Sequence, residues 1–224
     1  MQYSAPFLAL PDYRTGLFCE LLLGVPVSSP VSDTSGNSNP GTIVNATRIT
    51  DPVTGKKVLN FTPANAEVTI VETPAFNFDK NSGSVCFWVK PKAAENIFFA
   101  KNGSELTFNL LYSTKHQLRV YSAESGAELW GPNDVALNEW VMFTYVKDYP
   151  NTKLYLYQNE KLLTSKNEGR GYGTHAMQIG TSGAESHDFD MAMYRHYSGV
   201  LTAIEIKQIY QFTRRSILSM APIP

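Results

Sequence analysis

Two segments of the chain carry the residue types that proteins use to hold sugars. A pyranose presents an apolar C–H face and a ring of hydroxyls, so a sugar site combines an aromatic side chain with amides and charged groups. Trp130 lies in one polar segment, and Arg170, Tyr172 and His175 lie in a second, glycine-rich one. We take these four side chains as candidate ligand-binding residues. The alternatives are that Trp130 covers the core and that Tyr172 packs across a strand.

Signatures of several other chemistries are missing from the sequence. No Cys–His or Ser–His–Asp spacing of a nucleophile is recognisable, and the four histidines are scattered without cysteines at zinc-ligand spacing. The glycine-rich stretch 169–173 lacks the Lys-Ser/Thr pair and the helix of a phosphate-binding loop. Two cysteines are too few for a disulfide scaffold, which favours buried free thiols at Cys19 and Cys86.

The charge balance excludes two classes of partner. Nineteen Lys and Arg residues oppose twenty Asp and Glu residues, for a formal net charge of −1. Binding to nucleic acid or to an anionic membrane surface needs an excess of basic residues, so we expect neither partner. Insertion into a membrane is not expected either, because the apolar run 21–27 is interrupted by Gly24 and Pro26 and a span needs roughly 20 residues.

Side-chain alternation predicts an all-β domain. Segments 85–89, 141–146 and 154–157 place apolar residues on both faces. This pattern suits a packed two-sheet sandwich whose outer positions are half-exposed. Turn signals rich in Asn, Asp, Gly and Pro separate about a dozen such strands.

One helix is predicted near the C-terminus. Thr202 and Glu205 have the spacing of a capping box, and Ile206, Ile209 and Tyr210 then fall on one helical face. We expect this helix to seal one end or edge of the sandwich.

The two ends of the chain are apolar and contain proline, without helix or strand periodicity. Either they pack back on the same domain, or they dock on neighbouring subunits, because exposed apolar arms are otherwise a liability. We divide the chain into an N-terminal arm (1–15), one domain (16–212) and a C-terminal arm (213–224).

Four segments, in order along the chain, resemble the motifs of laminin-G-like domains in the concanavalin A-like lectin family. They are the opening loop DTSGNSNPGT (33–42), the strand GSVCFWVKP (83–91), the strand pair within 139–160, and the closing segment 189–206. The resemblance implies a single two-sheet antiparallel jelly-roll sandwich with one short C-terminal helix, covering residues 16–212. The chain departs from the family pattern at the turns 60–63 and 159–160.

The resemblance also implies a calcium site. Relatives often bind one Ca²⁺ between the opening loop and the closing strand, where this chain has Asp33, Asn37 and Asp190. The alternative is an Asx turn at Asp33 and an ion-paired Asp190.

The resemblance also bears on catalysis, because glycosidases of the family carry paired acids on one strand. In this chain Asp188 and Asp190 share a face, but the third acid of the family pattern is missing, so we expect no enzyme.

Together these features predict a non-catalytic jelly-roll surface protein, a structural, decoration or fibre component of a viral or phage particle that adheres to a cell-surface glycan. We expect self-association, or contact with neighbouring particle subunits, through the terminal arms. The N-terminus lacks the basic and apolar regions of a signal peptide, so the expected location is a virion or an extracellular surface reached without one. The alternatives are a soluble lectin-like carbohydrate-binding module and, less favoured, a diverged glycosidase.

Overall fold

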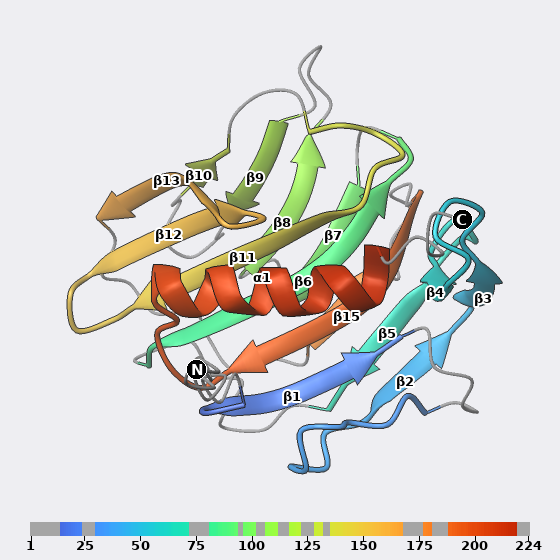
Figure 1. Ribbon diagram of the computed structural model, residues 1–224, viewed down its shortest axis with the longest axis horizontal. Helices are drawn as coiled ribbons and strands as arrows, with labels where there is room; N and C mark the ends of the chain where they lie inside the picture. The colour runs from blue at the N-terminus through green and yellow to red at the C-terminus, as the bar shows by residue number, and fades with distance from the viewer. Residues whose placement is uncertain are drawn as a thin grey trace, which may run out of the picture.

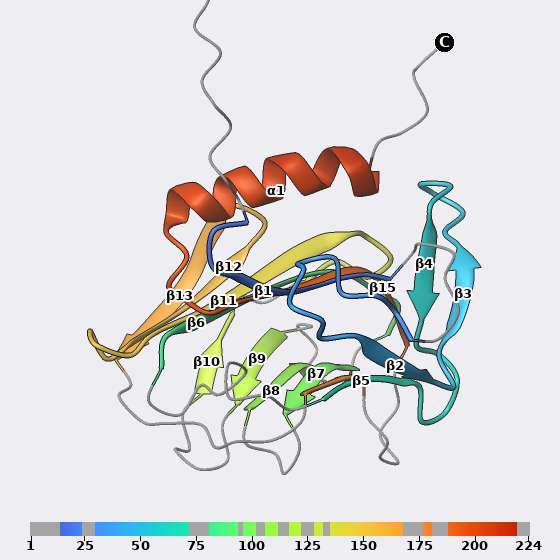
Figure 2. The same ribbon diagram turned by 90° about the horizontal axis from the view of Figure 1, so that it is seen from below.

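Two antiparallel β-sheets stack face to face, and one helix lies across the outer face of the larger sheet (Figures 1 and 2). The computed structural model describes residues 14–23, 30–71, 81–93, 96–101, 106–111, 117–121, 128–131, 135–167, 177–180 and 188–218. This architecture confirms the predicted jelly-roll sandwich.

Within the described residues the larger sheet has eight strands, in the order β13-β12-β11-β6-β15-β4-β3, with β1 also paired to β15. Their bounds are β1 (Leu17–Leu22), β3 (Thr47–Thr50), β4 (Lys57–Asn60), β6 (Gly83–Pro91), β11 (Val141–Asp148), β12 (Lys153–Gln158), β13 (Lys161–Asn167) and β15 (Phe189–Tyr197).

The smaller sheet has seven strands in the described part of the chain, in the order β10-β9-β8-β7-β14-β5-β2. Their bounds are β2 (Gly41–Val44), β5 (Glu67–Ile70), β7 (Asn96–Lys101), β8 (Leu106–Leu111), β9 (Gln117–Tyr121), β10 (Glu128–Trp130) and β14 (Met177–Gly180).

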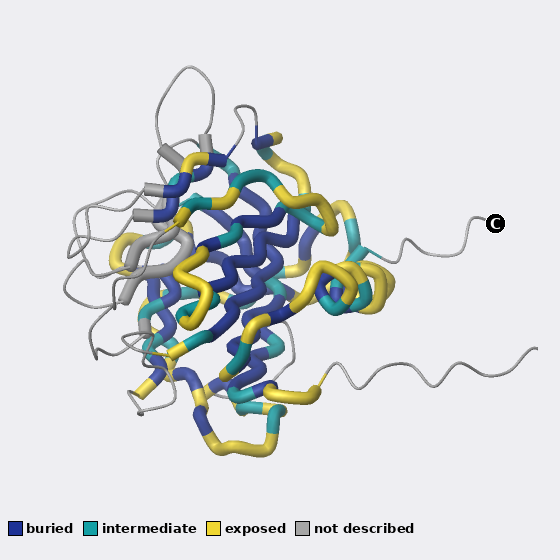
Figure 3. The backbone as a smooth tube through the Cα atoms, turned by 90° about the vertical axis from the view of Figure 1, so that its left-hand side faces the viewer, coloured by how far each residue is buried: buried dark blue, intermediate teal, exposed yellow. Residues whose placement is uncertain are grey.

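Alternation along β6 divides its side chains between two cores. Val85, Phe87 and Val89 pack between the two sheets. Cys86 and Trp88 point to the opposite face and pack beneath the helix. All five are fully buried, so the general expectation of half-exposed outer positions does not hold along β6, whereas the expected burial of the Cys86 thiol does. The helix covers this outer face (Figure 3).

The helix, α1 (Ala203–Leu218), begins at the predicted capping box. The backbone N–H of Thr202 donates to Glu205 Oε2 at 2.7 Å, and the N–H of Glu205 donates to Thr202 Oγ1 at 3.3 Å. Its buried side chains join the outer core of the larger sheet, so α1 covers a face of the sandwich rather than the end or edge we predicted. It continues to Leu218, so residues 213–218 of the segment we assigned to the C-terminal arm are helical.

None of the helices in the described part of the chain combines the length and the apolar character that a membrane span requires.

Candidate functional site

Trp130 ends the edge strand β10 of the smaller sheet, and 40% of its surface is exposed. Its cross-strand neighbour is Arg119 on β9, whose guanidinium carbon lies 5.7 Å from the centroid of the indole ring. The indole is therefore partly exposed, with a guanidinium over its ring, and its role as a platform for a sugar stays a prediction. Arg170, Tyr172 and His175 lie outside the described residues, so their place beside Trp130 stays a prediction.

A groove of about 440 Å³ lies between the β12–β13 turn and α1. Its walls combine two amides, one carboxylate, two cations and one aromatic ring: Gln158, Asn159, Glu160, Lys161, Leu163, Tyr210 and Arg214. Sequence reasoning did not find this groove, because its two walls are far apart in the sequence and meet only where α1 crosses the sheet.

Hydrogen bonds hold the turn that forms one wall of the groove. Asn159 has a φ of 57°, in the left-handed region that Gly and Asn tolerate best. Its backbone N–H donates to Met142 O at 2.7 Å, and its Oδ1 accepts the Met142 N–H at 3.0 Å. Gln211 on α1 donates to Glu160 Oε2 at 3.2 Å, which connects the turn to the helix.

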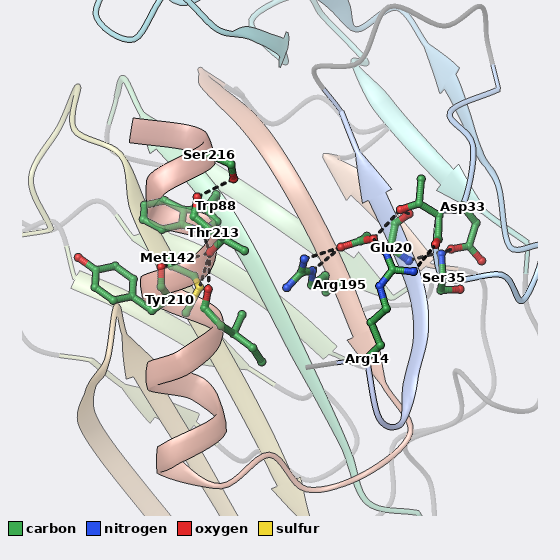
Figure 4. A network of polar contacts seen from close by, with 12 residues as sticks. Arg14, Glu20, Asp33, Ser35, Trp88, Met142, Arg195, Tyr210, Thr213 and Ser216 are labelled. Carbon is green, nitrogen blue, oxygen red and sulfur yellow. Dashed lines mark hydrogen bonds and ion pairs between the residues drawn. The ribbon is translucent and has the colours of Figure 1, made fainter. Parts of the chain in front are cut away.

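Tyr210 is fixed in the other wall. Its ring stacks on the buried Trp88 with centroids 5.6 Å apart and an interplanar angle of 15°, and Figure 4 shows both rings beside the helix. The guanidinium carbon of Arg214, one turn further along α1, lies 5.8 Å from the Tyr210 centroid. These contacts hold the turn backbone and Tyr210 in place, whereas Glu160, Lys161 and Arg214 are exposed side chains.

The proposed calcium ligands of the opening loop are engaged within the protein. Asp33 Oδ1 accepts the backbone N–H groups of Glu20 and Ser35, and Oδ2 accepts that of Asn39, each at 2.9 Å. The side-chain amide of Asn37 donates to the carbonyls of two β1 residues at 3.1 and 3.2 Å. These bonds fasten the opening loop to β1, as the Asx-turn alternative anticipated.

Asp190, the third proposed ligand, lies in a buried ionic cluster on the larger sheet. It is the cross-strand neighbour of Lys90 on β6 and Asn60 on β4. Its carboxylate receives Lys92 Nζ at 2.6 Å, Asn60 Nδ2 at 2.9 Å and Lys90 Nζ at 3.2 Å. Two cations already compensate this carboxylate, as the ion-pair alternative anticipated.

Asp51 completes this cluster. It is fully buried, forms an ion pair with Lys90, and accepts hydrogen bonds from Trp140 Nε1 at 3.0 Å and from Thr54 Oγ1 at 2.7 Å. Burial alone would raise the pKa of Asp51, but the hydrogen bonds from Lys90, Trp140 and Thr54 lower it from 3.8 to about 2. The cluster is thus anchored by an ionised carboxylate.

Among the residues that the structure describes, no group of three or more His, Cys, Asp or Glu side chains is arranged to hold a metal ion. Asp33 and Asp190 share no hydrogen-bond partner within that part of the chain. Calcium binding stays a prediction, and its residues lie in two separate polar networks.

The two carboxylates considered for catalysis are also engaged. Thr62 Oγ1 donates to Asp188 Oδ1 at 2.8 Å, while Asn60 links Thr62 to Asp190. Asp190 is fully buried. Asp188 is only partly buried, and a glycosidase acid–base pair needs both carboxyl groups within reach of the scissile bond.

Comparison with known proteins yields one family and a set of structural relatives. A model of the concanavalin A-like lectin/glucanases superfamily matches residues 65–207. No curated protein matches the chain in sequence.

Among solved structures, the binding domain of Paraclostridial Mosquitocidal Protein 1 superposes with a TM-score of 0.72 at 15% identity, over 90% of this chain and 53% of that one. The binding domain of botulinum neurotoxin DC in complex with SialylT has a TM-score of 0.67 at 14% identity, over 90% of this chain and 52% of that one. Domain 4 of AbnA, a GH43 extracellular arabinanase from Geobacillus stearothermophilus, in complex with arabinotriose, has a TM-score of 0.67 at 16% identity. That match covers 87% of this chain and 98% of the arabinanase domain.

This chain spans about half the length of the two toxin binding domains and nearly the whole of the arabinanase domain. At these identities the superpositions establish the fold, and they agree with the jelly roll described above. The sequence match covers more than half of the chain and confirms the resemblance found in its motifs. The chain belongs to the concanavalin A-like lectin/glucanases superfamily.

Proposed function

We propose that this protein is a non-catalytic carbohydrate-binding module. The observation that carries the proposal is the groove between the β12–β13 turn and α1, which offers donors and acceptors for hydroxyls beside an aromatic ring. Its volume of about 440 Å³ lies within the roughly 300–1,000 Å³ typical of ligand sites.

The polar groups of the groove suit a polyol. Gln158 supplies an amide, Glu160 accepts hydrogen bonds, and Lys161 and Arg214 donate them. Trp130, exposed on β10, would supply a second contact as the aromatic platform anticipated from the sequence. Arg170, Tyr172 and His175 remain proposed partners of Trp130 in that second contact.

Two structural relatives support this reading. The arabinanase domain, which this chain matches over nearly its whole length, was solved with arabinotriose, and the neurotoxin binding domain, matched over about half its length, was solved with SialylT. The engaged state of Asp188 and Asp190 favours binding over hydrolysis in our module.

The proposed setting is the surface of a viral or phage particle or another extracellular surface, with copies held together through the terminal arms. Display in many copies would raise the avidity of a weak site by about 10²- to 10⁴-fold. A soluble module acting singly is the alternative setting.

A glycan array probed with the full chain tests the proposed function. For the best array ligand we expect Arg214→Ala to weaken binding about ten-fold, measured by calorimetry. The matched control is Arg215→Ala, which removes the same charge from the next helical position, outside the groove. Absence of binding to any array glycan would overturn the proposal. Equal affinities of the two variants would move the site away from the groove, and Trp130→Ala would then test the second contact.

A further inference from the structure

A second hollow, distinct from the groove, lies beneath the C-terminal half of α1. It is a cavity of about 240 Å³ bounded by the helix on one side and by β1 and β15 on the other. Figure 4 shows the polar residues of the two strands on one side and the helical residues Thr213 and Ser216 on the other.

The strand side of the cavity is a buried ion pair. Arg195 Nε donates to Glu20 Oε1 at 2.7 Å, and both side chains are only 3% exposed. Thr34 Oγ1 donates to Glu20 Oε2 at 2.6 Å, and Arg14, half-exposed at the surface, lies 3.6 Å from the same oxygen. A network with this many partners holds the acceptor and the donors in fixed positions.

The charges of this pair compensate each other. Burial alone would lower the pKa of Arg195, but Tyr197 and Glu20 raise it, so the guanidinium remains charged opposite Glu20. A ligand placed here meets the carboxylate of Glu20 together with the guanidinium groups of Arg195 and Arg14, which both pair with it. A neutral molecule that has both hydroxyl donors and hydroxyl acceptors can bond to all three groups, whereas the two guanidinium groups would repel a cation.

The remaining walls are largely apolar. Leu22 and Met193 contribute from the strands, and Phe212 and Ile217 contribute from the helix. Phe212 lines the cavity and has 45% of its surface exposed, so its side chain is accessible to a ligand. A pyranose or furanose, with an apolar C–H face and a hydroxylated edge, has the amphipathic character that these walls require.

The size of the cavity favours one ring over a chain. A volume of about 240 Å³ is below the roughly 300–1,000 Å³ of pockets that hold drug-sized ligands. The open groove, nearly twice as large, accommodates a longer stretch of glycan.

We propose that the cavity beneath α1 is a site for a single sugar ring, with Glu20, Arg195 and Arg14 binding its hydroxyls and Phe212 covering its apolar face. This proposal rests on the proposed carbohydrate-binding function and adds to it a second site, suited to the terminal ring of a glycan.

Methyl-group NMR of the full chain, labelled at Ile, Leu and Met, is the test. The probes are the methyl glycosides of glucose, galactose, mannose and arabinose, each added separately. We expect at least one probe to shift the methyl signals of Leu22, Met193 and Ile217 along one saturation curve.

Two variants test the cavity site, and a third variant is the control. Ala192→Leu enlarges a side chain that lines the cavity and should weaken binding of the same probe about ten-fold. Phe212→Ala leaves the core intact, because Phe212 is half-exposed, and should weaken binding about three- to ten-fold. Ile204→Ala truncates an exposed apolar residue at the other end of the same helix, 69% exposed, and should leave binding unchanged.

The outcomes separate this proposal from the proposed function. If probes shift only Leu163 of the groove, or if both cavity variants bind as the wild type does, the cavity site is overturned and the carbohydrate-binding function stands. If array glycans bind but no methyl signal of the cavity moves, the cavity site is overturned as well. If neither glycans nor probes bind, both proposals fail.

Discussion

The indole N–H of Trp88, on β6, donates a 2.8 Å hydrogen bond to the hydroxyl of Thr213, on α1 (Figure 4). Thr213 is buried, and its hydroxyl in turn donates to the carbonyl of Ile209 at 2.7 Å. These two hydrogen bonds in series therefore join the central strand of the larger sheet to the backbone of the helix. Both proposed ligand sites have one wall on α1, so this bond positions them.

Removing the acceptor of this bond should destabilise the protein. Thr213→Val preserves the shape but leaves the Trp88 N–H buried without an acceptor, and we expect the free energy of unfolding in urea to fall by about 1–3 kcal/mol. The decisive comparison is a double-mutant cycle with Trp88→Phe, which removes the donor. In the Trp88→Phe background, Thr213→Val should be nearly neutral. If the free-energy costs of Thr213→Val and Trp88→Phe simply add in the double mutant, the hydrogen bond contributes nothing to stability.

The ionic cluster around Asp51 makes stability depend on pH at the acidic end. The pKa of Asp51 is about 2 in the folded protein, below the ordinary 3.8, so the ionised form contributes stability above about pH 4. That contribution is lost as the pH falls from about 4 toward 2. Asp51→Asn should therefore lower the free energy of unfolding by about 2 kcal/mol at pH 7.

Urea unfolding at neutral and at acid pH measures this effect. The difference between wild type and Asp51→Asn should shrink as the pH approaches 2. Glu139→Gln, which neutralises an exposed carboxylate, is the control and should cost little at either pH. A cost of Asp51→Asn that is the same at both pH values would mean that lost packing, not lost charge, destabilises the variant.

Much of the fold could be predicted from the sequence because its signals are local. Alternation in 85–89 marked β6, and the spacing of Thr202 and Glu205 marked the start of α1; the structure bears out both. The predicted buried free thiols are also found, at Cys19 and Cys86. Burial raises the pKa of the Cys86 thiol to about 11, as expected of a structural cysteine.

The position of α1 could not be predicted in the same way. The apolar outer residues of β6, Cys86 and Trp88, were a signal that something covers this face, but alternation does not say which segment does so. The groove and the cavity depend on that placement, since each joins α1 to strands distant in the sequence. Of the four candidate sugar-binding residues taken from the sequence, Trp130 alone lies in the described part of the chain. Its side chain is exposed, as an aromatic platform requires.

The calcium hypothesis can be tested at Asp190. Lys90, Lys92 and Asn60 already occupy its carboxylate, so Asp190→Ala removes partners that are independent of any metal. Loss of these partners lowers the Tm equally in calcium and in chelator, and a Ca²⁺ bound at Asp33, Asn37 and Asp190 should make the fall larger in calcium. A fall in Tm that is the same in both conditions would contradict the calcium site.

Trimming the C-terminus at two positions separates assembly from stability. Residues 213–218 belong to α1: Thr213 accepts the Trp88 hydrogen bond, and Ile217 and Leu218 pack against the outer core. A chain ending at Phe212 should therefore lose stability, whereas a chain ending at Leu218 should unfold at nearly the same urea concentration as the full chain.

Light scattering on the same three chains tests the proposed role of the arms. If residues beyond Leu218 hold neighbouring copies together, the chain ending at Leu218 should have a lower molar mass than the full chain while remaining folded. Measuring the urea midpoint and the molar mass on one sample distinguishes loss of stability from loss of assembly. Loss of α1 packing would lower the unfolding midpoint, whereas loss of assembly alone would lower only the molar mass. If the full chain is already a monomer, the C-terminal arm does not mediate assembly, and the soluble carbohydrate-binding module becomes the favoured setting.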